Sequence, residues 1–190
     1  MSTTIAASLY KPLVWIDCEM TGLDTSKDHI IEIACIITDG HLKTVAELDS
    51  IIIRQPKALL DSMDAWCTEH HGASGLTAAV LSSPVSMADA EETVMAFITK
   101  HIPEPKVGLL AGNSVHADKR FLEFDMPRVV GHLGYRILDV STVKEITGRW
   151  YPSVFANLPR KNYDHRALGD IRESITELKW YRENVFKTAE

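Results

Sequence analysis

This chain is organised around the sequence WIDCEMTG at residues 15–22. The apolar run at 13–16 predicts a buried strand, which ends in two carboxylates two residues apart. Strand side chains alternate between faces, so Asp17 and Glu19 should face the same way with Cα atoms about 6.5 to 7 Å apart. Like charges this close repel each other unless a cation lies between them. The pair is therefore either a metal-binding site or a solvated acidic strand end, and this fragment leaves both readings open.

Composition indicates one ordinary globular domain. The 190 residues are 45% hydrophobic and 24% charged, and we expect a single domain over 1–190 with residues 1–11 flexible. The formal net charge of -6 argues against a protein that grips long nucleic acid through a broad basic face. A metal site would bring its own positive charge, however, and a very short oligonucleotide offers few phosphates to neutralise.

The sequence shows no signal for a membrane or for secretion. Apolar runs stay well below the ~18 residues of a membrane-spanning helix, and residues 1–10 have no signal-peptide pattern. We expect an intracellular protein, with the cytoplasm as default and the mitochondrion or nucleus as alternatives. Cys18, Cys35 and Cys67 are widely spaced, which predicts reduced thiols and not a disulfide framework or a zinc site.

The remaining chain predicts a strand meander followed by alternating helices and strands. Predicted strands after the first cover 30–37, 45–53, 107–111 and 135–140, with a hairpin turn at 39–40. Predicted helices cover 63–71, 76–81, 86–101, 115–124 with Ser114 as N-cap, 142–150 and 167–186. Residues 55–61 and the segment containing Pro152 and Pro159 are expected to be connections. This order fits an α/β layered domain with a mixed sheet.

Three further residues could join the first two acids. Asp118 lies in the first turn of the predicted 115–124 helix, where an acid is also favoured by the helix dipole alone. His165 and Asp170 would be about 140° apart on one continuous helix, so they converge only if His165 lies in the turn before it. A histidine beside acids could act as a general base, whereas the alternative is a capping or surface histidine.

Four ordered segments resemble the DEDDh group of 3′-to-5′ exonucleases in the ribonuclease H-like superfamily, and more closely the oligoribonucleases. They are WIDCEMTGL at 15–23, AGNS with DKRFL at 111–122, YR with DVST at 135–142, and HRAL at 165–168 with Asp170. One short motif would be weak evidence, but four with this order and spacing are specific. The resemblance covers most of the chain and implies a ribonuclease H-like mixed five-stranded sheet with one antiparallel strand, flanked by helices.

The resemblance also implies an activity. The expected reaction is 3′-to-5′ hydrolysis of very short single-stranded RNA, especially dinucleotides, to 5′-mononucleotides by a homodimer. Two divalent ions, Mg²⁺ or Mn²⁺, would be held by Asp17, Glu19, Asp118 and Asp170, with His165 as general base. Family members often have an Asp where this chain has Gly169, which puts in doubt only a contribution from that position.

Substrate contacts follow from the same resemblance. Leu23 and Trp66 would sandwich the two bases, although Trp66 alone also fits a half-buried core residue. A polar cap for the 5′-phosphate, which would close the site to longer chains, maps onto Ser114, Arg136 and Ser141, with further contributions from His71 and from the partner subunit's Tyr135. His70 beside His71 leaves the register open, and the spacing from Trp66 favours His71.

Two alternative functions remain at this point. One is a related exonuclease that trims longer RNA or proofreads DNA, and the other is a catalytically silent domain used for binding. The acidic charge and the Leu23, Trp66 and Arg136 set count against the first. All four acids and His165 are present, which counts against the second.

Overall fold

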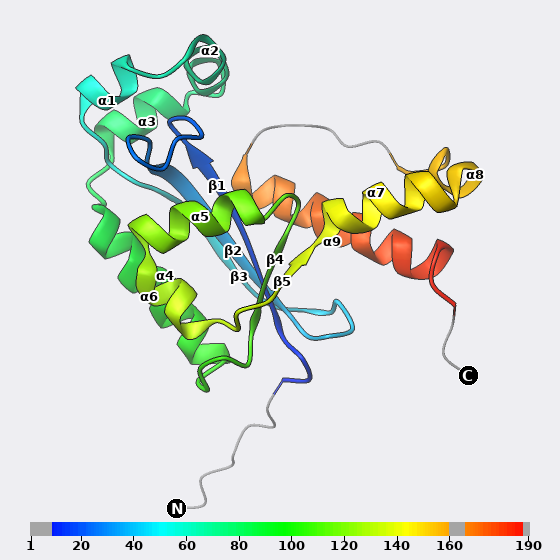
Figure 1. Cartoon of the computed structure of the whole chain (residues 1–190). Coiled ribbons are helices and arrows are strands. Elements are labelled where there is room, and N and C mark those ends of the chain that lie inside the picture. The colour runs from blue at the N-terminus through cyan, green and yellow to red at the C-terminus, as the bar shows by residue number, and fades with distance from the viewer. Residues whose placement is uncertain (1–8, 160–165, 188–190) are drawn as a thin grey trace, which may run out of the picture.

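A computed structural model describes residues 9–159 and 166–187 (Figure 1). The strands are β1 (Leu13–Met20), β2 (Ile30–Thr38), β3 (Thr44–Ile52), β4 (Leu109–Gly112) and β5 (Ile137–Asp139). The helices in this part of the chain are α1 (Lys57–Asp61), α2 (Ala65–Ala73), α3 (Leu76–Ser82), α4 (Met87–His101), α5 (His116–Asp125), α6 (Pro127–His132), α7 (Val140–Trp150), α8 (Pro152–Phe155) and α9 (Ala167–Asn184).

The five strands form one mixed sheet in the order β3-β2-β1-β4-β5. Strand β2 is antiparallel to both β1 and β3, whereas β4 is parallel to β1 and β5 is parallel to β4. The predicted meander and the mixed sheet with one antiparallel strand are therefore confirmed. Strand β1 lies at the centre, so the carboxylates at its end are surrounded by neighbouring elements.

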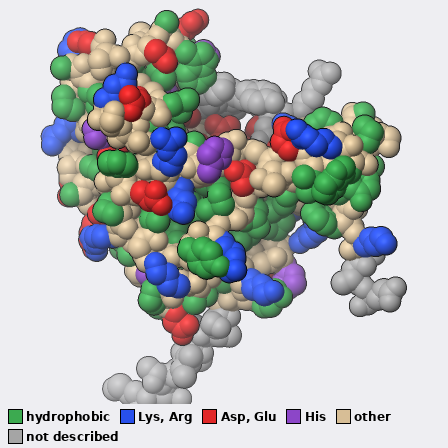
Figure 2. All heavy atoms as spheres, viewed as in Figure 1, with side chains coloured by type: hydrophobic (Ala, Val, Ile, Leu, Met, Phe, Trp, Pro, Cys, Tyr) green, Lys and Arg blue, Asp and Glu red, His purple; other side chains and the backbone are tan. Residues whose placement is uncertain are grey.

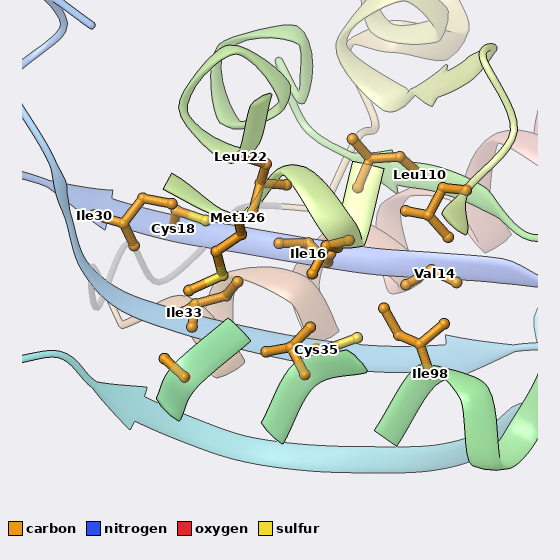
Figure 3. Packing of buried hydrophobic residues seen from close by; sticks show 14 of the residues in the cluster. Val14, Ile16, Cys18, Ile30, Ile33, Cys35, Ile98, Leu110, Leu122 and Met126 are labelled. Atoms are coloured by element: carbon orange, nitrogen blue, oxygen red, sulfur yellow. The ribbon is translucent and has the colours of Figure 1, made fainter. Parts of the chain in front are cut away.

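Helices cover both faces of the sheet, and β1 contributes alternate side chains to each face. Val14, Ile16 and Cys18 pack with residues of α4, α5 and α6 (Figure 3). Leu13 and Trp15 pack on the opposite face with α9 and the start of α7. Because Asp17 and Glu19 continue the second series, strand alternation directs them towards the face that α9 covers.

The long helices form where the sequence periodicity is clearest. Helix α4 begins with a capping box in which Ser86 and Asp89 bond each other's backbone N–H groups. Its fully buried residues, Ala90, Val94 and Ile98, recur every four residues and face the sheet. Helix α9 buries Ile171, Ile175, Leu178 and Tyr181 against the other face, as their spacing predicted.

Three short helices, α1, α6 and α8, were not predicted. Each has at most six residues, which is too short for a clear periodic pattern and too short to be stable without tertiary contacts. Pro127 and Pro152 stand in the first turn of α6 and α8, where proline's fixed φ suits a helix start. The expectation of a plain connection at 55–61 and through Pro152 was therefore wrong.

Ser114 is not the N-cap of α5. Val115 occupies that position, and in the described structure no side-chain hydrogen bond caps this helix. Ser114 has a positive φ of 50°, unusual for a residue with a side chain, and its hydroxyl lies near Ser141 instead. The prediction failed because the serine takes part in a tertiary contact.

The ends of the chain are only partly described. Residues 1–8 of the segment expected to be flexible lie outside the described range, while the carbonyl oxygen of Tyr10 accepts a hydrogen bond from Gly40 N–H at 2.7 Å. Among the helices of the described segments, none combines the length and apolarity needed to cross a membrane.

Candidate active site

Three carboxylates meet where β1 ends. Asp17 and Glu19 come from β1, and Asp170 comes from the first turn of α9. One carboxylate oxygen of each lies within 4.8 Å of one from the other two. Strand alternation and the packing of α9 against β1 thus produce the convergence that the sequence predicted for these three residues.

Burial and mutual repulsion make this cluster unfavourable by itself. The pKa of Asp17 is raised well above its usual range, first by burial and then by the negative charges of Asp118, Glu19 and Asp170. Burial and the neighbouring Glu32 raise the pKa of Glu19 to about 8. Such a group of carboxylates needs either protons or a cation.

Asp118 approaches the cluster from the other side of β1. It lies in the first turn of α5, is buried, and its Oδ1 accepts a hydrogen bond from the Cys18 N–H at 3.0 Å. Burial raises its pKa to about 7 although this hydrogen bond acts in the opposite direction. Asp118 is not one of the three carboxylates within 4.8 Å, but after burial it contributes most to the raised pKa of Asp17.

These residues fit divalent cations of the hard type. Mg²⁺ and Mn²⁺ prefer oxygen ligands, and every donor in the group is a carboxylate. The raised pKa values show that negative charge at this place is poorly compensated by the protein alone. His165, the predicted general base, lies outside the described residues.

A buried ion pair beside the cluster was missed by the sequence analysis. Glu32 on β2 is fully buried opposite Glu19, and its Oε1 accepts hydrogen bonds from Arg166 Nε at 3.3 Å and from a terminal guanidinium nitrogen at 3.2 Å. Its Oε2 has no hydrogen-bond partner within the described structure. The available signal was a lone acid inside the β-branched run of residues 30–37.

Leu23 and Trp66 both line a cavity of about 420 Å³ next to the carboxylates. Glu19, Met20, Cys67 and His71 also line it. Leu23 is 76% exposed and Trp66 is 52% exposed, so Trp66 is not a core residue. Both are large apolar side chains with much of their surface exposed, which makes that surface available to a planar ligand.

His71 is another residue that lines this cavity. It is buried on α2, and its Nε2 is 2.9 Å from the carbonyl oxygen of Met20 at the end of β1. Its ring meets that of Trp66 edge-on at 6.5 Å, while His70 stacks on Trp66 at 4.0 Å. Burial lowers the pKa of His71, so the ring is neutral near pH 7. The structure places His71 with the Trp66 cavity and not with Ser114 and Ser141.

Asp28 holds the turn that presents Leu23. Its two carboxylate oxygens accept hydrogen bonds from the Thr21 hydroxyl and from the Asp24 N–H, each at 3.0 Å. The carboxylate passes so close to Gly22 that a Cβ there would lie 2.4 Å from Asp28 Oδ2. Gly22 is therefore a steric requirement of this turn, and Thr21 supplies a hydrogen bond to it.

Ser114 and Ser141 form a second polar group, joined through Asp139. The Ser114 N–H lies 2.9 Å from both Asp139 Oδ1 and Ser141 Oγ, and the two hydroxyls are 3.1 Å apart. Asp139 Oδ1 also accepts the Ser141 N–H at the start of α7. We call Ser114 and Ser141 the serine pair. They line an open cavity of about 370 Å³ together with His116 and Arg149.

Tyr135 and Arg136 precede β5 and are exposed. The Arg136 guanidinium lies over the Tyr135 ring at 4.5 Å, and Tyr135 is 74% exposed. Both side chains are thus available to a ligand or a partner, and they precede Ser141 of the serine pair by six and five residues.

The carboxylate cluster suits divalent cations, and comparisons with known proteins identify the class to which the chain belongs. The family described as Exonuclease matches residues 14–178. Among solved structures, exonuclease I from Methylocaldum szegediense gives a TM-score of 0.68 at 17% identity, covering 92% of this chain and 41% of that one. Exonuclease I from E. coli, solved in complex with a dA16 oligonucleotide, gives 0.70 at 15% identity over 92% and 41%. The fold is that of the ribonuclease H-like exonucleases.

Relatives among curated proteins narrow this class. Mitochondrial oligoribonuclease of Mus musculus is 55% identical over 180 residues, which is 95% of this chain and 76% of the relative. Mitochondrial oligoribonuclease of Saccharomyces cerevisiae is 47% identical over 96% of this chain and 71% of the relative, and oligoribonuclease of Streptomyces griseus is 50% identical over 92% and 86%. The chain belongs to the oligoribonuclease family and is an exoribonuclease.

Proposed function

We propose that this exoribonuclease acts from the 3′ end on very short RNA, above all dinucleotides, and releases 5′-mononucleotides. One observation carries the proposal: Glu19 belongs both to the carboxylate cluster and to the lining of the Leu23–Trp66 cavity. A base held in that cavity brings its phosphodiester next to the carboxylates. The site is thus suited to a substrate whose bases are held within a few ångströms of the reacting bond.

Asp17, Glu19, Asp118 and Asp170 are the proposed ligands of two divalent ions, Mg²⁺ or Mn²⁺. When bound, such ions supply Lewis acidity to the phosphodiester and lower the pKa of the attacking water. His165 is the proposed general base that takes the proton of this water. Its role rests on the resemblance; the described residue that follows it, Arg166, is bonded to Glu32, which pairs with Glu19 across β1 and β2.

Leu23 and Trp66 are the proposed base-stacking residues. Stacking uses the faces of the bases and not their hydrogen-bonding edges, so the enzyme should accept all four bases with similar efficiency. His71 is proposed as a further substrate contact, because it lines the same cavity and its ring meets that of Trp66 edge-on.

A 5′-phosphate cap is proposed at the serine pair with Arg136. The Ser114 hydroxyl and the Arg136 guanidinium provide donors for a phosphate, and Arg is suited to bind it through two parallel hydrogen bonds. A cap that contacts the first phosphate would leave no path for additional 5′ nucleotides. It would therefore select dinucleotides over longer chains.

The cap is tested with Arg136→Ala on two substrates. We expect kcat/KM for a 5′-phosphorylated dinucleotide to fall about 10- to 100-fold, the loss of one charged hydrogen-bonding partner, with little change for the same dinucleotide without the phosphate. Arg149→Ala is the matched control, because Arg149 lines the same open cavity but pairs with Glu145 of its own helix. An equal loss on both substrates would remove the cap hypothesis.

A homodimer is also proposed, with the partner's Tyr135 reaching the site. Support comes from exposed aromatic side chains: Tyr135 is 74% exposed, and Trp150 at the end of α7 is 68% exposed with Tyr151 beside it. Hydrophobic side chains gather over α7 and α8 in Figure 2. Because relatives from mouse and yeast are named mitochondrial oligoribonucleases, we include the mitochondrion with the cytoplasm among the proposed locations.

A further inference from the structure

The serine pair is joined to the first turns of α9 by two residues that no part of the proposed function uses. The Ser141 hydroxyl donates to Asn113 Oδ1 at 3.3 Å, and Asn113 Nδ2 donates to Ser174 Oγ at 2.6 Å. The Ser174 hydroxyl donates in turn to the backbone carbonyl oxygen of Asp170 at 2.8 Å. A chain of three hydrogen bonds thus runs from Ser141 on α7 to a residue of the carboxylate cluster.

The donors and acceptors along this chain are mutually consistent. A serine hydroxyl has one hydrogen, and Ser141 uses it towards Asn113 while its oxygen accepts from the Ser114 N–H. In the 3.1 Å contact between the two hydroxyls, Ser114 is then the donor. Ser141 is held by its neighbours, and the Ser114 hydroxyl is the one whose hydrogen can turn to a bound phosphate.

The backbone at Ser114 depends on the same contacts. Its φ of 50° is unfavourable for a residue with a Cβ, and Asp139 Oδ1 and Ser141 Oγ receive its N–H in that conformation. Asn113, directly before it, is held by Ser174, which is buried on α9. The turn is therefore held from α7 on one side and from α9 on the other.

We propose that Asn113 and Ser174 are positioning residues that fix the distance between the serine pair and Asp170, and thereby set the preference for a 5′-phosphorylated dinucleotide. The inference rests on the proposed cap and adds its mechanical link to the carboxylates. A dinucleotide has one phosphodiester and one terminal phosphate, so both must reach their contacts at a single spacing. If the distance between the serine pair and Asp170 varies more, the 5′-phosphate should increase kcat/KM by a smaller factor.

The test compares Ser174→Ala, Asn113→Ala and the double variant with wild type. The substrates are the same RNA dinucleotide with and without a 5′-phosphate, in Mg²⁺. We expect the ratio of kcat/KM between these substrates to fall about 5- to 10-fold in each single variant, mainly through KM of the phosphorylated one. The ratio in the double variant should fall no further than in the single variants, because each single change already breaks the Asn113–Ser174 hydrogen bond.

Thr176→Ala is the matched control. Thr176 lies on the same helix and its hydroxyl donates to the carbonyl of Arg172 four residues earlier, as Ser174 does to Asp170, but it is exposed and faces away from Asn113. We expect its ratio to equal that of wild type. Ser174→Thr, which keeps the hydroxyl, should restore most of the ratio.

A second readout needs no turnover. In EDTA, a saturating 5′-phosphorylated dinucleotide should raise the melting temperature of wild type and of Thr176→Ala more than that of Ser174→Ala. The positioning role would be overturned if Ser174→Ala and Asn113→Ala lowered kcat/KM equally for both substrates. It would also be overturned if Thr176→Ala lowered the ratio of kcat/KM between the substrates as much as they do. A wild-type enzyme indifferent to the 5′-phosphate would instead overturn the proposed cap, and with it this inference.

Discussion

At the scale of single residues, the site holds negatively charged carboxylates close together in a buried place, where few positive groups of the protein offset their charge. Asp17, Glu19 and Asp170 bring oxygens within 4.8 Å of each other, and burial strengthens their repulsion. A protein without ions therefore retains a local cost in its folded state, which bound cations would remove. Catalytic capacity and intrinsic stability are opposed at this place.

Asp170→Asn separates the two properties. We expect it to abolish Mg²⁺-dependent RNA hydrolysis, because a carboxylate ligand is lost, and to raise the melting temperature in EDTA by about 2 to 4 °C, corresponding to roughly 1 kcal/mol of relieved repulsion. Differential scanning calorimetry and a turnover assay measure the two effects. Asp49→Asn, an exposed acid on β3, should change neither property. Near-normal hydrolysis by Asp170→Asn would contradict the assignment of this residue as a metal ligand.

The Glu32–Arg166 pair should contribute to stability, because Glu32 is fully buried and lies beside Glu19. Arg166→Ala leaves that carboxylate without its cation, but Arg166 is 45% exposed and water can partly replace it. We expect a loss of about 1 to 3 kcal/mol, below the roughly 3 to 5 kcal/mol of a fully buried pair. Urea unfolding measures it.

Arg172→Ala provides the comparison for this prediction. Arg172 lies on α9, six residues after Arg166, and pairs with Glu47 at 2.5 Å on the surface, where such pairs contribute about 1 kcal/mol or less. Equal losses of unfolding free energy in both variants would show that the burial of Glu32 has no energetic consequence.

At the scale of secondary-structure elements, the turn after β1 sets the position of Leu23, a proposed substrate contact. The turn after β1 presents Leu23 and is held by Asp28 against Gly22. Gly22→Ala introduces a Cβ 2.4 Å from the carboxylate, so the turn must shift. We expect KM for dinucleotides to rise about 5- to 20-fold, because Leu23 moves from its place in the cavity that Trp66 also lines, with a smaller change in kcat.

Gly131→Ala in α6 is the control for steric strain at a glycine. A Cβ there would meet no heavy atom of the described residues within 4 Å, and the helix should gain up to about 1 kcal/mol. Its kinetics should equal those of wild type. A Gly22→Ala enzyme with unchanged KM would show that the position of Leu23 does not affect binding.

The elements differ in how far the sequence predicted them. Strands β1 and β2 were predictable because they are continuous apolar runs that are buried on both faces, and α4 and α9 because their buried residues recur with helix periodicity. Helices α1, α6 and α8 were not, since they are short and depend on contacts from distant parts of the chain.

The acidic residues of the site could be predicted from the sequence, but the polar contacts around them could not. Alternation along β1 placed Asp17 and Glu19 on one face, and the resemblance supplied Asp118 and Asp170. Asn113 and Ser174 could not be found, because their bond joins residues 61 positions apart through the tertiary structure. His165 stays a prediction.

At the scale of the whole molecule, surface charge and exposed aromatic groups bear on partners. On the face in Figure 2, acidic and basic side chains are interspersed and form no broad basic area. With a net charge of -6, this agrees with a substrate that has few phosphates. Trp150 and Tyr151 are exposed at the end of α7, and Figure 1 shows this end of α7 away from the end of β1, so the proposed dimer contact there would leave the carboxylate cluster uncovered.

A change at Trp150 tests assembly. We expect wild type to sediment as a dimer, and Trp150→Glu to sediment as a monomer because a charge would be buried in the interface. Phe124→Glu, an equally exposed aromatic on α5, should leave the dimer intact. Analytical ultracentrifugation measures both, and a monomeric wild type at micromolar concentration would contradict the dimer proposal.

The most direct test of the central claim is the dependence of hydrolysis on RNA length. The measurement is kcat/KM in Mg²⁺ for 5′-phosphorylated RNAs of two, three, five and about twenty nucleotides, with DNA of the same lengths in parallel. The cavity beside Glu19 and the proposed cap predict a maximum at the dinucleotide and a decrease of at least tenfold by five nucleotides. A twenty-nucleotide strand degraded as efficiently as the dinucleotide would contradict the account.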